Sequence, residues 1–270
     1  MPVTVTWWGC AAVAIDSGDR AVAIDPFTHP RDGRFEYLFL THEHYDHLHA
    51  PTLETLTRSP RFKLAVVARS CVLPSDLFYA RRVTWLRPDQ LIVLYPKYRE
   101  AGLAGEPPGP VELRLGGWSV EGVHSPGEEA SVPVPVVGPV PQLGYLLRDG
   151  PSGVSFYHPG DLCRPYDALA ELRGRVDVLF LPLGKLGLDG DRRLLELIRP
   201  GAVVPTHYRY EPDYPVPRAY RDDEPLEEQI LGFQFPGPDD PDAYVAALAD
   251  HAGPLGVDLL RLRAGSPHTL

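Results

Sequence analysis

The stretch of sequence that decides the fold is Tyr37-Leu38-Phe39-Leu40-Thr41-His42-Glu43-His44-Tyr45-Asp46-His47. Its first four residues form a continuous apolar run, which is typical of a strand buried on both faces. The polar residues that follow have the pattern H-x-H-x-D-H. Loops at the carboxyl ends of strands are where α/β folds usually place their chemistry. The stretch therefore predicts an α/β fold with a functional loop directly after this strand.

The residue types in this loop are the usual ligands of a borderline divalent metal such as zinc. Alternate residues of an extended segment point the same way, so His42 and His44 can converge on one ion. Asp46 and His47 lie where the chain bends, and they can turn toward a second ion beside the first. We therefore expect a metal centre here. The alternative interpretation is a solvated polar loop that happens to be rich in histidine.

The order of elements along the chain supports one large α/β unit. The first forty residues predict short strands, and residues 112–123 predict a hairpin around Gly116-Gly117. From Leu143 onward, strands alternate with helices. No linker and no internal repeat separates domains. We expect a single domain over residues 1–270, with a C-terminal helical extension from about residue 222.

The bulk composition excludes several classes of protein. The chain of 270 residues has 26 basic and 36 acidic residues, a formal net charge of −10, which argues against a nucleic-acid partner. No apolar stretch approaches the roughly 18 residues of a membrane span, and the N-terminus lacks the features of a signal peptide. Three widely spaced cysteines without a C-x-x-C pair indicate reduced thiols and a cytoplasmic protein. The 31 prolines and the absence of Asn fit a thermophilic source or GC-rich codon usage equally well.

The run from Thr41 to His47 resembles the metal motif of the metallo-β-lactamase superfamily, and the resemblance extends along most of residues 1–210. It implies a four-layer αββα sandwich. Four further motifs follow the same order, namely Ile24-Asp25-Pro26-Phe27, His124, Tyr157-His158-Pro159-Gly160-Asp161 and Pro205-Thr206-His207-Tyr208. Together with Trp7-Trp8-Gly9 and Leu181-Pro182-Leu183-Gly184, they are most similar to the branch of ascorbate-6-phosphate lactonase-like bacterial hydrolases. Cys10 departs from that branch, whose members often carry His there.

The resemblance implies two divalent metal ions and a set of ligands for each. His42, His44 and His124 would hold the first ion, and Asp46, His47 and His207 the second, with Asp161 between them. Zinc is the expected metal, with manganese and iron as alternatives. Taken alone, His124 or His207 could be an ordinary histidine, and Asp161 could merely cap the turn at Leu162. Asp25 is expected to orient a ligand histidine or to stabilise the loop, and not to bind metal itself. His49 and His158 are expected to support the ligands.

The expected activity is hydrolysis of an ester, lactone or phosphodiester of a small molecule by a metal-bridging hydroxide. Asp46 would take or relay the proton of the nucleophile. Candidate substrate-pocket residues neighbour the ligand motifs, and they are Tyr45, Glu128, Lys185 and Tyr208. The Pro-rich loop 125–141 is placed to cover the site, and Cys10 and Cys163 are expected to be structural thiols.

Two other functions stay open at this point. One is a di-iron redox enzyme of the same fold, although its flavin-linked members typically carry Glu where this chain has His44. The other is a non-catalytic metal-binding protein, although structural zinc sites are usually closed by four ligands that often include Cys. RNA processing is disfavoured by the acidic balance. The expected partner is a small-molecule substrate, and a homo-oligomer is a base-rate expectation only.

Overall fold

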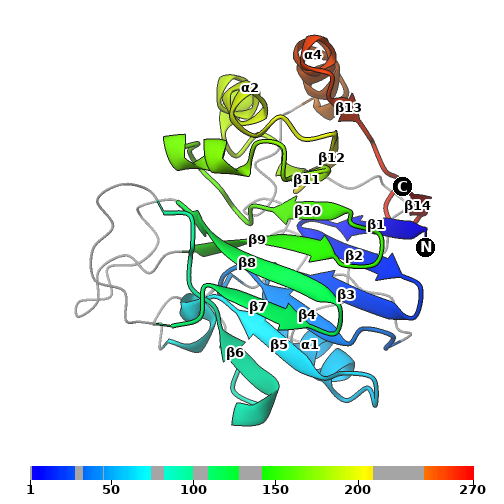
Figure 1. Cartoon of the computed structure of the whole chain (residues 1–270), viewed down its shortest axis with the longest axis vertical. Helices are drawn as coiled ribbons and strands as arrows, with labels where there is room; N and C mark the ends of the chain where they lie inside the picture. The colour runs from blue at the N-terminus through cyan, green and yellow to red at the C-terminus, as the bar shows by residue number, and fades with distance from the viewer. Residues whose placement is uncertain are drawn as a thin grey trace, which may run out of the picture.

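Two mixed β-sheets flanked by helices make up the fold in a computed structural model of the chain (Figure 1). The structure describes residues 2–27, 33–44, 46–73, 82–99, 109–127, 142–208 and 240–270. The helices are α1 (Ala50–Thr57), α2 (Gly187–Ile198) and α4 (Pro241–Ala252). Within these described ranges, no helix is long and apolar enough to cross a membrane.

The first sheet has seven strands in the order β14-β1-β2-β3-β4-β5-β6. Their bounds are β1 (Val3–Gly9), β2 (Ala12–Ser17), β3 (Arg20–Ile24), β4 (Tyr37–Leu40), β5 (Leu64–Val67), β6 (Leu91–Val93) and β14 (Pro267–Thr269). Strands β3 to β6 run parallel to one another, whereas β1, β2 and β14 pair antiparallel. Strand β4 is buried along its whole length, as its apolar run predicts.

The second sheet also has seven strands, in the order β13-β12-β11-β10-β9-β8-β7. Their bounds are β7 (Glu112–Leu115), β8 (Trp118–Ser125), β9 (Gln142–Asp149), β10 (Ser155–His158), β11 (Val178–Pro182), β12 (Ala202–Thr206) and β13 (Asp258–Leu259). Strands β7 and β8 form the predicted hairpin, with Gly116 and Gly117 both at positive φ in its turn. Strands β10 to β13 run parallel.

The two sheets meet at the carboxyl end of β4. The hydroxyl of Tyr145 on β9 donates to the carbonyl of Leu40 at 2.7 Å, and the amide of Leu143 donates to the carbonyl of Thr41 at 2.9 Å. Phe39 packs edge-on against Tyr145, with 5.3 Å between ring centroids. One continuous hydrophobic core contains side chains of both sheets. The loop after β4 is therefore held by both halves of the sandwich.

The C-terminal segment completes both sheets. Of the helical extension expected from about residue 222, the structure describes residues 240–270, which contain α4, β13 and β14. Strand β14 pairs with β1, and β13 pairs with β12, so each lies at an edge of one sheet. Figure 1 shows α4 beside α2, next to the β11–β13 end of the second sheet.

A buried carboxyl group joins the last two helices. Asp191 of α2 is fully buried, and its Oδ2 accepts a hydrogen bond from the hydroxyl of Tyr244 on α4 at 2.6 Å. Burial raises the pKa of Asp191 to about 7. The unfolded chain loses this proton near its ordinary pKa of 3.8. Between these two pH values the folded state keeps a proton that the unfolded state has lost, so stability falls as pH rises.

We predict that Asp191→Asn removes this part of the pH dependence. The free energy of unfolding of the variant relative to wild type should rise by up to about 1.4 kcal/mol per pH unit between pH 5 and 7 and then level off. Urea denaturation at a series of pH values measures it. Asp189→Asn, an exposed change in the same helix, is the control and should follow wild type. An Asp191→Asn curve parallel to wild type would contradict the prediction.

Candidate metal centre

The predicted ligands converge because they follow the carboxyl ends of strands. The loop after β4 carries His42, His44, Asp46 and His47. Asp161 follows β10, and His207 follows β12. Parallel strands end at a common edge of their sheet, and the contacts at Leu40 and Thr41 bring the two edges together.

Two carboxylates lie at the middle of this cluster. Oδ2 of Asp46 is 3.4 Å from Nε2 of His47 and 3.3 Å from Nε2 of His207. Oδ1 of Asp161 is 3.1 Å and 3.3 Å from the same two nitrogens. Oδ2 of Asp161 is 3.8 Å from Nε2 of His42. All five side chains are buried.

These distances define groups that can each hold a metal ion. In each group the ligand atoms lie within 4.8 Å of one another. The groups are His42 with His44 and Asp161, His47 with Asp161 and His207, and Cys10 with Asp46 and His207. Asp161 belongs to the first two groups, and its position between two ions, which the resemblance implies, stays a prediction.

The turn that carries Asp161 is held against the loop after β4. Gly160 has φ of +63°, and a Cβ at this position would lie 2.9 Å from Cβ of Thr41. The amide of Gly160 donates to Nδ1 of His158, whose Nε2 donates to the carbonyl of Ala11. Since a carbonyl can only accept, the proton of His158 is on Nε2. His158 thus supports the site without facing the ligands, as expected.

Asp25 holds the ring of His47 and the backbone of Thr41, and the role of His47 as a ligand stays a prediction. Its Oδ2 is 2.8 Å from Nδ1 of His47, and its two oxygens accept from the amide and hydroxyl of Thr41 at 2.8 and 2.6 Å. A carboxylate on one ring nitrogen leaves the other nitrogen as the metal ligand and fixes the plane of the ring. Nε2 of His47 accordingly faces the cluster.

The charges of the cluster call for a cation. Burial alone would raise the pKa of Asp46, but His47 and His207 hold it well below its usual range. Burial alone would also raise the pKa of Asp161, but His207, Lys185 and His47 lower it. Burial lowers the pKa of His47, yet the facing carboxylates, Asp161 foremost, raise it well above the ordinary value. Two ionised carboxylates away from water therefore require positive charge, from a proton or from a metal.

The donor set fits a divalent metal. Nε2 of His42, Nε2 of His47 and Oδ1 of Asp161 are buried, and none makes a hydrogen bond within the described part of the chain. Imidazole nitrogen and carboxylate oxygen suit zinc and neighbouring divalent metals. A cation between these atoms would satisfy buried groups that are otherwise costly to leave without hydrogen bonds.

The other predicted site residues are placed less centrally or lie outside the described residues. His124 is buried at the end of β8, but it belongs to none of the three groups, so its role as a ligand stays a prediction. Nζ of Lys185 lies 2.7 Å from Oδ2 of Asp161. The ring of Tyr208 stacks on Trp7, with 4.7 Å between centroids. Tyr45 and Glu128 lie outside the described residues, as do residues 128–141 of the Pro-rich loop.

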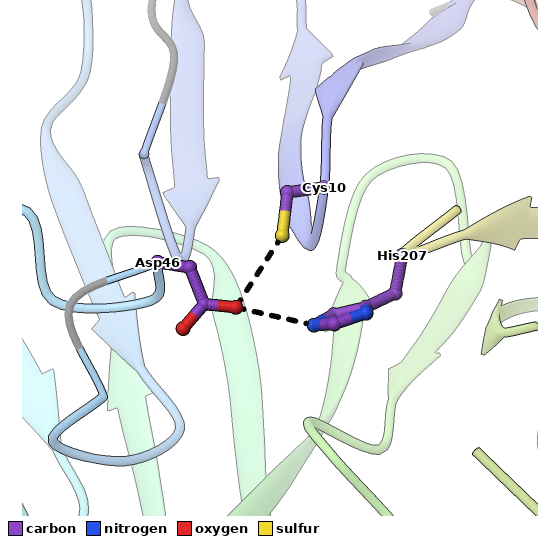
Figure 2. A group of neighbouring side chains, drawn as sticks. All are labelled: Cys10, Asp46 and His207. Carbon is purple, nitrogen blue, oxygen red and sulfur yellow. Dashed lines mark hydrogen bonds and ion pairs between the residues drawn. The ribbon is translucent and has the colours of Figure 1, made fainter. Parts of the chain in front are cut away.

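Cys10 is the site residue that the sequence analysis missed. It is buried, as expected of a structural thiol, but its Sγ lies 3.6 Å from Oδ2 of Asp46 (Figure 2). Figure 2 shows Cys10 and His207 approaching the same oxygen from different elements. The available signal was its position directly after Trp7-Trp8-Gly9, one of the motifs of the resemblance.

The chain belongs to the beta-lactamase superfamily, because residues 4–207 match the profile of the beta-lactamase superfamily domain. A UPF0173 metal-dependent hydrolase of Pyrococcus furiosus is 27% identical over 232 residues, which cover 78% of this chain and 86% of the relative. The expected family and αββα fold class are thereby confirmed. The finer placement near ascorbate-6-phosphate lactonase stays a prediction.

Two solved structures resemble the fold. Igni18, a metallo hydrolase from Ignicoccus hospitalis, has a TM-score of 0.63 at 19% identity, covering 100% of this chain and 99% of that chain. CmlA, a diiron beta-hydroxylase from Streptomyces venezuelae, has a TM-score of 0.62 at 17% identity, covering 100% of this chain and 54% of that chain. Both likenesses concern the fold alone.

We predict that Asp25→Asn weakens metal binding while keeping the fold. Asn tolerates the φ of +45° at this position, but its single carbonyl oxygen cannot accept from both Thr41 and His47. Zinc affinity should fall about 10- to 100-fold, measured by competition with a chromophoric chelator. Asp19→Asn, in the exposed turn between β2 and β3, serves as the control. Unchanged affinity in Asp25→Asn would show that Asp25 does not act through His47.

Proposed function

We propose that the protein is a dinuclear metal-dependent hydrolase of small molecules. The observation that carries this proposal is that Asp161 belongs to two adjacent groups of ligand atoms. Ions bound by His42 and His44 on one side, and by His47 and His207 on the other, would have this carboxylate in common. His124 and Asp46 would complete the two ligand sets.

Divalent cations bound there would lower the pKa of a shared water and stabilise the charge that develops on the oxygen of an ester, lactone or phosphodiester. The chain's own residues prepare the site for this chemistry. Asp46 contacts Nε2 of both His47 and His207, and we assign to it the role of accepting or relaying the proton of the nucleophile. Asp25 contacts His47 in the loop after β4, and His158 accepts a hydrogen bond from Gly160 in the turn that carries Asp161. No side-chain nucleophile is required.

Zinc is the metal we propose, with manganese and iron as alternatives, because most of the donors are imidazole nitrogens. Iron would bring the redox alternative back, and a site that binds metal without turnover would support a non-catalytic protein. His42, Asp46, Asp161 and His207 are buried, so the centre does not lie on an open surface. This burial supports a small-molecule substrate.

Lys185 supplies a positive charge beside the proposed reaction centre. Its Nζ contacts Asp161, and its side chain keeps 12% of its surface exposed. If the Asp161 oxygens bind metal, Lys185 could instead contact a phosphate or carboxylate on the substrate. An anionic substrate is therefore the one we favour.

We predict that the double variant His42→Ala, His44→Ala loses the first ion. Its metal content after purification without chelator should fall by about half or more. Hydrolysis of a panel of phosphodiesters, lactones and esters should fall about a thousandfold in kcat/KM, as expected for losing several kcal/mol of stabilisation. His251→Ala, on helix α4, is the control and should keep both. Unchanged metal content would contradict the site, and iron with oxygen consumption would contradict the hydrolase.

A second prediction concerns Lys185→Gln. We expect the KM for an anionic substrate to rise about tenfold, the size expected for losing a hydrogen bond to a charged group, while the KM for a neutral lactone changes little. Steady-state kinetics on both substrates measures the difference. Lys63→Gln, an exposed lysine paired with Glu36, is the matched control. Equal effects on both substrates would mean that Lys185 acts only through Asp161.

A further inference from the structure

Cys10 lies in the turn between β1 and β2, and its backbone is fixed to the rest of the site. Its carbonyl accepts hydrogen bonds from Nε1 of Trp7 and from the amide of His207, both at 2.8 Å. Cys10 and His207 both have positive φ, 46° and 56°, which is uncommon for residues other than glycine. The turn and the loop after β12 therefore hold each other in place, with Cys10 and His207 both facing Asp46 (Figure 2).

The distances within this group match those between ligands of one metal ion. Zinc binds oxygen and nitrogen at about 2.0 Å and sulfur at about 2.3 Å, so in a tetrahedron two such ligands stand about 3.3 Å (N and O) or about 3.5 Å (S and O) apart. Nε2 of His207 lies 3.3 Å from Oδ2 of Asp46. Sγ of Cys10 lies 3.6 Å from the same oxygen, and all three ligand atoms are within 4.8 Å of one another.

The surroundings favour a ligand over a thiol that merely fills space. Next to this group, Nε2 of His47 is buried and makes no hydrogen bond within the described residues, although it lies 3.4 Å from Oδ2 of Asp46. Cys71, the other fully buried cysteine, instead has its Sγ 4.0 Å from a backbone carbonyl, that of Leu40. Cys10 is therefore distinguished from Cys71 by the side-chain carboxylate and imidazole that it meets.

We propose that Sγ of Cys10 is a ligand of the ion bound by Asp46 and His207. The inference rests on the proposed metal centre and adds one donor to its second ion. A thiol that ligates a metal does so as the thiolate, so its proton leaves to solvent when the cation binds. A soft sulfur donor makes this ion different from the one at His42 and His44, because it favours zinc, cobalt or cadmium over manganese or magnesium.

Cobalt substitution tests the assignment with a signal that does not depend on catalysis. The full chain is titrated with Co²⁺. A near-ultraviolet thiolate-to-cobalt charge-transfer band should appear by the time two equivalents of cobalt are bound. Cys10→Ser should lose the band while still binding cobalt. In addition, the ratio of Cd²⁺ to Mn²⁺ affinity should fall by about tenfold or more in Cys10→Ser, because its hydroxyl is a harder donor.

A second variant keeps the test decisive if Cys10→Ser fails to fold. The chain has three cysteines, so the double variant Cys71→Ser, Cys163→Ser leaves Cys10 as its only thiol, and the band must persist. Cobalt binding with no band in wild type, or a band lost in this double variant, overturns the assignment but leaves the hydrolase proposal intact. Failure to bind any divalent metal overturns both.

Discussion

The rest of the site depends on the burial of two carboxylates, Asp46 and Asp161, among the histidine side chains at the carboxyl ends of the strands. Neither carboxylate is stable there without a facing positive charge, because the interior solvates an ion poorly. His47, His207 and Lys185 face the two carboxylates. The cluster contains more nitrogen and oxygen atoms than are needed to bind a single proton. A divalent cation would supply the same charge. It would also bind Nε2 of His42, Nε2 of His47 and Oδ1 of Asp161, which make no hydrogen bond to the residues that the structure describes. The charges of the cluster and its buried polar atoms thus both indicate a bound divalent cation.

The scaffold positions these groups by holding the backbone in uncommon conformations. Among the described residues other than glycine, only Cys10, Asp25, Arg199 and His207 have positive φ, and three of these four belong to the site or support it. Such conformations persist only where surrounding contacts determine them. Here the contacts are the hydrogen bonds of Asp25 to Thr41 and of His207 to Cys10, which join different strand ends. The strain therefore lies in the loops, while the parallel strands beneath them stay regular.

The two halves of the centre differ in chemistry. The half around His42 and His44 offers nitrogen and one carboxylate, whereas the half around Asp46 and His207 also meets a sulfur. Asp161 is the carboxylate common to both halves. Among the described residues, Lys185 is the only charged side chain other than histidine that forms an ion pair with it. Metal ions held by the two halves would therefore have different ligand sets.

The sequence by itself determined the local parts of this protein. The apolar run 37–40 predicted strand β4, Gly116 and Gly117 predicted the hairpin, and the spacing of His42, His44, Asp46 and His47 predicted a metal site, since strand period, turn chemistry and ligand spacing act over a few residues. Only the tertiary structure decided that Cys10 meets Asp46, that Lys185 meets Asp161, and that β13 and β14 close the two sheets. These contacts join residues far apart in the chain, and they depend on which strand ends share an edge. No local pattern of residues contains that information.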